Sequence, residues 1–256
     1  MGFLFFHDWP IVTNGGELCM FSLLFLMACQ FFYNGTEDQF VMEFYKVASY
    51  NKGIDHAVRS SVLVECHMID DSGDEPDSVL AGHGSGNYLY SGDHKFILTA
   101  SHVVSNCHIV VVKTRHGAAI TAEVAYDNKL RDVAILKPLG EFPVLDPIKM
   151  NIDRRNPLIG QQVFFMGHPV ELHYFLFQGI VSQEGETHIW LHSTAWAGAS
   201  GSVVFSSKGR IVGTLSAVKV VQEPILGVPR VLEDMVLISK TDFLSKKFIK
   251  EIMNEK

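Results

Sequence analysis

The chain has 256 residues, of which 47% are hydrophobic and 19% charged, a composition typical of a globular protein with a buried core. The formal net charge is −7, and Lys and Arg are not gathered into a stripe. Because nucleic-acid binding relies on concentrated positive charge, no nucleic-acid partner is expected. Four cysteines, Cys19, Cys29, Cys66 and Cys107, are too few for a disulfide scaffold of this length and include no C-x-x-C pair.

An apolar run occupies residues 18–29 near the N-terminus. It is too short to span a bilayer but fits the core of an export signal, and LMAC at 26–29 is similar to a bacterial lipidation site. No Lys or Arg precedes Lys46, so the basic flank of an export signal is missing. Two interpretations stay open for residues 1–45. They are a signal or anchor, with membrane association through residues 18–33 and an exported protein, or a hydrophobic helix packed on a cytoplasmic protein.

Downstream of residue 45 the pattern is mainly β. Short runs rich in β-branched and aromatic residues, separated by turn signals, predict strands in the first half at 60–66, 87–90, 95–100, 108–114 and 132–138. A Pro-containing connector at 140–160 is followed by predicted strands at 161–167, 174–182, 188–194, 201–207, 210–218 and 234–239. Such spacing predicts an all-β protein of two packed six-stranded antiparallel barrels, at about 58–145 and about 158–240.

Helical periodicity returns only at the C-terminal end of the chain. Thr241 or Asp242 is suited to cap a helix over 241–256, whose apolar residues recur at helical spacing, namely Leu244, Phe248, Ile249, Ile252 and Met253. We expect this helix to pack on the second barrel.

A candidate nucleophile, Ser200, lies in the sequence GASGS at 198–202. A serine hydroxyl needs a base to take its proton and a group that stabilises the resulting oxyanion. The small residues around Ser200 allow a sharp turn, in which the N–H groups of Gly198 and Ser200 form an oxyanion hole. The same pattern also occurs in ordinary tight turns. An α/β-hydrolase elbow is not matched, because position 202 is Ser and a predicted strand follows.

A candidate base and a candidate acid lie in the first half of the chain. His102 directly follows the predicted strand 95–100, where a ring projects away from a core rather than into it. Asp132 begins the apolar run 132–138, and a carboxylate at the edge of a core needs a partner such as an imidazole N–H. Each residue alone is equally compatible with a structural role. Together, the order His102, Asp132, Ser200 across two β-rich halves is that of the chymotrypsin-like triad.

Four stretches in this order carry recognisable motifs: GHGSGNYLYSGDHKFILTASHVV (82–104), AEVAYDNKLRDVAILKP (122–138), FQGIVSQEG (177–185) and GASGSVVFSSKGRIVGTLSA (198–217). They resemble the trypsin-like serine peptidases of the HtrA (DegP-like) branch, over about residues 58–240. The resemblance implies a peptidase domain at 46–256 that hydrolyses peptide bonds of a protein or peptide substrate. It implies a His102–Asp132–Ser200 triad and an acyl-enzyme intermediate, without cofactor or metal.

The sequence departs from the family pattern beside the nucleophile. Ser202 replaces the usual second Gly, Val203 replaces the usual Pro, and Ala199 replaces Asn or Asp. These changes make the wall after Ser200 bulkier but remove no triad atom and no oxyanion amide. The segment 241–256 is too short for the PDZ domain of larger family members, so none is expected.

The resemblance also implies the location of the S1 pocket, which is assigned to Thr194, Ala195, Leu215, Ser216 and Ala217. No acidic side chain stands among them. A small or medium apolar P1 residue is therefore expected rather than Arg or Lys.

Two other functions and two metal sites are alternatives to this interpretation. A catalytically inactive relative that binds peptides or scaffolds a complex stays open, and a serine hydrolase acting on esters is disfavoured by the missing elbow. The acidic segment 69–78 does not match an EF-hand loop, and Cys-His neighbours at 66–67 and 107–108 point to opposite faces of a strand, which disfavours zinc. Pairing of Cys66 with Cys107 requires export, which the sequence does not decide.

Overall fold

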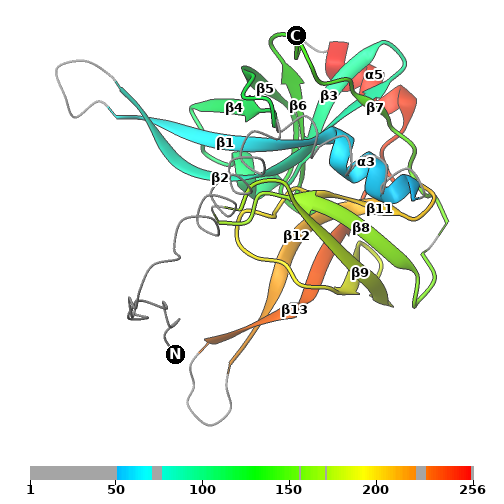
Figure 1. Ribbon diagram of the computed structural model, residues 1–256. Coiled ribbons are helices and arrows are strands. Elements are labelled where there is room, and N and C mark those ends of the chain that lie inside the picture. The colour runs from blue at the N-terminus through cyan, green and yellow to red at the C-terminus, as the bar shows by residue number, and fades with distance from the viewer. Residues whose placement is uncertain (1–50, 71–76, 156, 171, 223–228, 255–256) are drawn as a thin grey trace, which may run out of the picture. The chain divides into compact units, whose positions relative to one another are not determined.

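The structure is a computed structural model that describes residues 51–70, 77–155, 157–170, 172–222 and 229–254 (Figure 1). The chain divides into two compact units, Met1–Val47 and Ala48–Lys256, and every described residue belongs to the second. The alternatives for residues 1–45, including the apolar run and the membrane segment 18–33, lie outside the described residues. Within the described ranges, no helix combines the length and apolar character needed to cross a membrane.

The first barrel is built from β1 (Ser61–Asp70), β2 (Asp77–Ser91), β3 (His94–Thr99), β4 (Ile109–Lys113), β5 (Ala119–Asn128) and β6 (Val133–Pro138). They follow one another around the barrel in the order β1-β4-β5-β6-β3-β2, and antiparallel pairing of β1 with β2 closes it. A two-residue strand, β7 (Ile148–Lys149), adds in parallel to β2. Alternate residues of the strands, such as Val110 and Val112 of β4, fill the interior.

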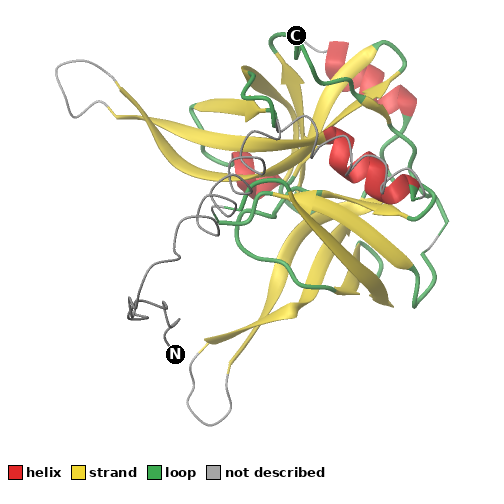
Figure 2. Ribbon diagram, in the orientation of Figure 1, coloured by secondary structure: helices red, strands yellow, loops and turns green. Residues whose placement is uncertain are grey.

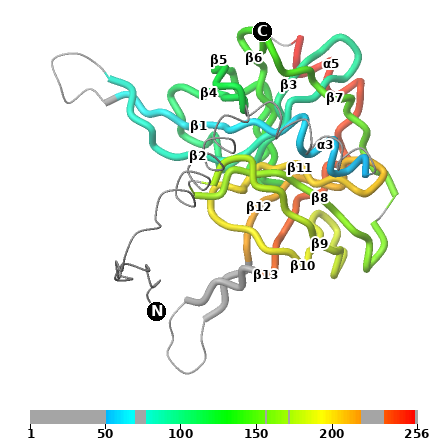
Figure 3. Tube along the Cα trace, in the orientation of Figure 1, coloured from blue at the N-terminus to red at the C-terminus, as the bar shows by residue number. Residues whose placement is uncertain are grey.

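The second barrel is built from β8 (Gln162–Gly167), β9 (Phe175–Glu184), β10 (His188–His192), β11 (Val203–Ser206), β12 (Ile211–Gln222) and β13 (Pro229–Lys240) (Figure 3). These strands close in the order β10-β13-β12-β11-β8-β9, with every pairing antiparallel. The predicted fold class of two six-stranded antiparallel barrels is therefore confirmed.

One strand of the first barrel escaped the sequence prediction. β5 covers residues 119–128, and the sequence prediction had no strand between 114 and 132. Most side chains of β5 are exposed or half-buried, and Ala122 is its one buried residue. A strand with so little apolar content gives almost no periodic signal.

A helix that the sequence did not predict, α3 (Lys52–Ser60), precedes the first barrel (Figure 2). The Asn51 side chain caps it by accepting hydrogen bonds from the Gly53 N–H at 2.9 Å and the Ile54 N–H at 3.3 Å. Its buried face is made of small residues, which is why apolar periodicity was weak. The helix packs against β8 and β11 of the second barrel, where His56 Nδ1 lies 2.8 Å from the Gly209 carbonyl oxygen.

The C-terminal helix, α5 (Lys246–Asn254), begins later than predicted. Ser245, rather than Thr241 or Asp242, provides the cap, because its Oγ accepts a hydrogen bond from the Phe248 N–H at 3.1 Å. The prediction that it packs on the second barrel was wrong. It packs against β2, β3 and β5 of the first barrel, where the Phe248 ring meets Tyr126 edge-on.

Candidate active site

His102 lies on a single helical turn, α4 (Ser101–Val104), that directly follows β3. Val103 and Val104 are buried in the core of the first barrel, and this anchoring leaves the His102 side chain 49% exposed. A hydrogen bond from Ser101 Oγ to a carboxylate oxygen of Asp127 also ties the turn to β5. The sequence prediction that the ring projects away from the core describes its position correctly.

Asp132 ends the turn between β5 and β6. Asn128 Oδ1 accepts a hydrogen bond from the Arg131 N–H at 3.0 Å, and Asp132 itself has a φ of +50°, a conformation that few non-glycine residues adopt. Val133 follows at once and is fully buried. The strand start therefore fixes the Asp132 backbone at the edge of the core, with its side chain 19% exposed.

The Asp132 carboxylate binds both the backbone and the ring of His102. The His102 N–H donates to Oδ1 at 2.9 Å, while Nδ1 lies 2.8 Å from Oδ2 and 3.0 Å from Oδ1. A neutral imidazole in this position carries its proton on Nδ1, which leaves Nε2 as an acceptor. The prediction that Asp132 needs an imidazole partner agrees with this geometry.

A second donor reaches the same carboxylate from the other barrel. Ser216 Oγ on β12 donates to Asp132 Oδ2 at 2.5 Å. Burial by itself raises the pKa of Asp132, but the hydrogen bonds from His102 and Ser216 outweigh it and hold the pKa below its ordinary value. The carboxylate is therefore ionised at neutral pH.

Ser200 lies in a tight loop that precedes β11. Gly198 has a φ of +94°, and a Cβ there would lie 2.4 Å from the His168 carbonyl oxygen, so only glycine fits. The carbonyl oxygens of Gly198, Ala199 and Ser200 all accept hydrogen bonds from other groups of the protein. Within the described ranges, neither the Gly198 N–H nor the Ser200 N–H donates a hydrogen bond, and both amides are available to an oxyanion.

The serine loop is held against the first barrel by Ser85 of β2. The Ser85 N–H donates to the Ser200 carbonyl oxygen at 2.7 Å, and Ser85 Oγ donates to the Gly198 carbonyl oxygen at 2.7 Å. The same hydroxyl accepts from the His168 N–H at 2.9 Å. Sequence reasoning did not single out Ser85, although it lies in the quoted segment 82–104, because a serine that binds backbone groups has no pattern of its own.

The His102 turn and the Ser200 loop are close neighbours. A Cβ on Gly84 would lie 2.5 Å from a methyl group of Val103 and 3.0 Å from the Ser200 carbonyl oxygen, so one glycine backbone separates them. The side-chain hydrogen bonds of His102 within the described part of the chain all go to Asp132, and none goes to Ser200. The structure thus brings together His102, Asp132, Gly198 and Ser200.

The five residues predicted for the S1 pocket occupy different environments. Ala195 and Leu215 belong to the core of the second barrel, while Thr194 and Ala217 are exposed. Ser216 is half-buried, and its hydroxyl is engaged by Asp132. Their role in substrate selection stays a prediction.

A buried histidine, His168, lies against the serine loop, with its carbonyl oxygen next to Gly198. His168 is fully buried, and burial, together with the nearby His173 and His83, lowers its pKa to about 3. His83 Nε2 lies 3.0 Å from the His168 carbonyl oxygen. His168 is therefore neutral at physiological pH, and the histidines around it were not predicted to contribute to the site.

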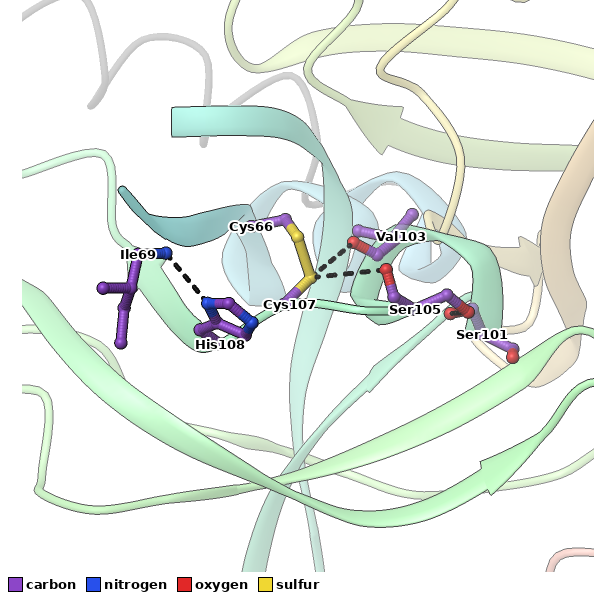
Figure 4. The surroundings of a disulfide bond; sticks show 7 residues. All are labelled: Cys66, Ile69, Ser101, Val103, Ser105, Cys107 and His108. Carbon is purple, nitrogen blue, oxygen red and sulfur yellow. Dashed lines mark hydrogen bonds between the residues drawn. A yellow bond between two sulfur atoms is a disulfide. The ribbon is translucent and has the colours of Figure 1, made fainter. Parts of the chain in front are cut away.

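A disulfide joins Cys66 on β1 to Cys107, just beyond the His102 turn (Figure 4). Beside it, His108 Nδ1 accepts a hydrogen bond from the Ile69 N–H at 2.9 Å. Neither cysteine offers a thiolate to a metal in this state. Across the described residues, no group of three or more His, Cys, Asp or Glu side chains is placed to hold an ion.

Comparison with known families decides the affiliation. The family model described as "Trypsin-like peptidase domain" matches residues 84–213, which is half of the chain. The chain belongs to the trypsin-like peptidase family. The matched range includes His102, Asp132 and Ser200. β11, rather than a helix, follows Ser200, as expected outside the α/β-hydrolase class.

The relatives of this trypsin-like peptidase domain include named serine endoproteases. A "probable periplasmic serine endoprotease DegP-like" from Pseudomonas putida is 29% identical over 143 residues, which cover 53% of this chain and 29% of the relative. "Serine endoprotease DegS" from Haemophilus influenzae is 29% identical over 140 residues, covering 50% of this chain and 40% of the relative. The chain thus spans well under half the length of these relatives. These similarities support the HtrA-like resemblance.

A solved structure supports the fold. The serine endoprotease from Yersinia pestis superposes with a TM-score of 0.61 at 24% sequence identity, covering 80% of this chain and 67% of the other. The similarity thus extends over most of this chain.

Proposed function

We propose that the protein is a serine endopeptidase in which Ser200 is the nucleophile, His102 the general base and Asp132 the residue that orients the base. The observation that carries the proposal is the double contact of Asp132 with His102, beside a serine loop with two unoccupied amides. The names of the relatives, serine endoproteases, support the same reaction class.

The reaction proceeds in two halves. His102 Nε2 takes the Ser200 hydroxyl proton while Oγ attacks the scissile carbonyl carbon, and the N–H groups of Gly198 and Ser200 stabilise the oxyanion. The C–N bond breaks as His102 gives its proton to the leaving amine, which leaves an acyl-enzyme. Water then attacks the ester, His102 takes its proton, and Ser200 is regenerated. Asp132, ionised because of its lowered pKa, stabilises the protonated His102 throughout.

The proposed substrate is a protein or peptide with a small or medium apolar P1 residue. No acidic side chain stands among Thr194, Ala195, Leu215, Ser216 and Ala217 to bind a basic one. Profiling with a peptide library checks this specificity. A preference for Arg or Lys at P1 would overturn it.

An oxidising compartment fits the Cys66–Cys107 disulfide, since such bonds persist mainly in exported proteins. One of the relatives carries the word periplasmic in its name. We therefore favour the exported protein over the cytoplasmic one. Alkylation of free thiols directly on cell lysis tests this, and rapid labelling of Cys66 and Cys107 would contradict it.

The decisive experiment combines a covalent probe with a cleavage assay. A fluorophosphonate should label the purified protein at Ser200, and unfolded casein should be cleaved. Ser200→Ala should abolish both, and His102→Ala should lower both by about 10⁴-fold or more. Ser207→Ala, at an exposed turn serine, serves as the matched control and should keep full activity. Labelling that persists in Ser200→Ala would overturn the assignment of the nucleophile.

A catalytically inactive peptide-binding relative is the second candidate. The absence of a His102–Ser200 hydrogen bond among the described residues favours it, because an active base must reach the hydroxyl. In an enzyme this bond shortens when substrate binds. Peptide binding without cleavage or probe labelling in the wild-type protein would establish the inactive relative.

A further inference from the structure

Two of the three departures beside Ser200, Ser202 and Val203, form hydrogen bonds that the usual residues of the family cannot form. Ser202 Oγ donates to the Ala199 carbonyl oxygen at 2.8 Å, and glycine has no hydroxyl to do so. The Val203 N–H donates to Asn87 Oδ1 of β2 at 2.8 Å, and proline has no N–H. Ser202, Val203 and Asn87 are all fully buried. The first bond therefore closes the loop on itself, and the second ties the end of the loop to β2.

The Ser202 contact fixes the direction of an oxyanion amide. The Ala199 C=O and the Ser200 N–H belong to one planar peptide unit, and none of the described peptide bonds is cis. In a trans peptide these two groups point in opposite directions. The hydrogen bond from Ser202 fixes the direction of the Ala199 C=O. It therefore also fixes the Ser200 N–H in the opposite direction, in which it can donate to an oxyanion.

The Ala199 oxygen has two donors, and the hydroxyl is the closer one. The Ser202 N–H reaches it at 3.2 Å, compared with 2.8 Å for Ser202 Oγ. Rotation of the 199–200 peptide would break both bonds and leave a carbonyl and a hydroxyl unpaired in a buried place, which is costly. Removal of the hydroxyl alone leaves the longer bond, so the loop keeps its fold but the peptide is held less firmly.

We infer that Ser202 is a positioning residue, which orients the Ser200 N–H of the oxyanion hole through the Ala199 carbonyl. The inference rests on the proposed serine endopeptidase function. Val203 complements it, because its bond to Asn87 anchors the end of the loop to the first barrel. The two hydrogen bonds thus restrain a segment in which the usual proline would itself fix φ.

The test compares Ser202→Ala with the wild-type protein and with Ser91→Ala. Ser91 is a buried serine at the last residue of β2, and its hydroxyl makes no hydrogen bond within the described residues. In Ser202→Ala, kcat for a peptide substrate should fall by about 5- to 30-fold with KM within twofold. This loss is smaller than the roughly 10²–10³-fold typical when an oxyanion donor itself is removed. Ser91→Ala should match the wild type in kcat and KM.

A second measurement separates positioning from general damage to the site. A peptide aldehyde forms a hemiacetal whose oxyanion occupies the hole, so its Ki should rise in proportion to the loss of kcat. Binding of the amine-side product peptide, which places no carbonyl oxygen in the hole, should not change. Thermal unfolding verifies the fold of each variant, and Ser202→Gly replaces Ser202→Ala if the latter does not fold.

Each outcome bears on a different conclusion. Unchanged kcat and aldehyde Ki in Ser202→Ala would overturn the inference while leaving the peptidase function intact. Equal weakening of aldehyde and product binding would also overturn it, since that indicates loss of the site as a whole. A wild-type protein that neither cleaves peptides nor reacts with a fluorophosphonate would overturn the proposed function, and the inference with it.

Discussion

The hydroxyl of Ser216 donates to Oδ2 of Asp132 at 2.5 Å, and this bond crosses from the second barrel to the first. The same oxygen lies 2.8 Å from Nδ1 of His102. Asp132 is therefore held by a partner from each barrel, so its position depends on how the barrels are docked.

Ser216→Ala should lower kcat by about tenfold with little change in KM, because a hydrogen bond to a charged carboxylate contributes roughly 1.5–3 kcal/mol. Loss of this donor also raises the pKa of Asp132 toward its ordinary value. Steady-state kinetics measures the effect, with Ser182→Ala on the exposed face of β9 as the control. Unaltered kcat in Ser216→Ala would show that His102 alone is enough to position Asp132.

Ser85→Ala should destabilise the protein by about 1–3 kcal/mol, since it leaves the buried His168 N–H and the Gly198 carbonyl without their shared hydroxyl. Urea unfolding gives the free energy, and Ser207→Ala is the exposed control. Activity should fall as well, because the loop carrying Ser200 loses one of its two bonds to Ser85. A stability equal to that of Ser207→Ala would contradict this account.

His168 should make the protein sensitive to mild acid. Its folded-state pKa is about 3, well below the ordinary value, so between pH 6.5 and 3 the unfolded chain binds a proton that the folded chain does not. The stability from this group is complete above pH 6.5 and is lost as the pH falls, by about 2 kcal/mol between pH 7 and pH 5. Urea unfolding at both pH values measures the loss.

His168→Gln supplies the comparison for this pH dependence, because glutamine does not titrate. The difference in unfolding free energy between pH 7 and pH 5 should shrink by the same amount in the variant. An identical difference in both proteins would show that His168 is protonated in the folded state.

Reduction of the Cys66–Cys107 disulfide should lower the free energy of unfolding by about 2–4 kcal/mol, since the bond closes a loop with a sequence separation of 41 residues. Thermal unfolding with and without dithiothreitol detects this. The double variant Cys66→Ala/Cys107→Ala should unfold at the same temperature as the reduced wild type, and dithiothreitol should not change that temperature. Equal sensitivity of the double variant would place the effect elsewhere in the chain.

The sequence revealed those parts of the fold in which apolar residues are periodic. The runs that became β3, β6 and β8 are buried and β-branched or aromatic, and they were predicted closely. β5 and α3 were missed because an exposed strand and a helix burying Gly53, Ala57 and Val58 carry little apolar signal. The packing of α5 was misassigned, because nearness in sequence says nothing about which barrel a terminal helix covers.

The site shows the same division. The order of His102, Asp132 and Ser200, with flanking motifs, was readable, since each stands next to a predicted strand. The supporting contacts were not: Ser85 and Ser202 bind backbone carbonyls, and Ser216, assigned to a pocket, binds Asp132. Such contacts depend on which loops the two barrels bring together, and a residue type does not encode them.

The two helices at the ends of the described chain pack mainly on the barrel that is distant in sequence. α3 precedes the first barrel but lies mostly against β8 and β11 of the second, with a smaller contact to β2, and α5 follows the second barrel but packs on the first. A chain shortened to end at Lys240 would retain all strands of both barrels. It would nevertheless uncover apolar surface on the first barrel, around Tyr126, and lose the buried side chains of Ile249 and Ile252. Boundaries drawn from strand content alone would therefore yield an aggregation-prone product, and fusion partners are better attached beyond Asn254.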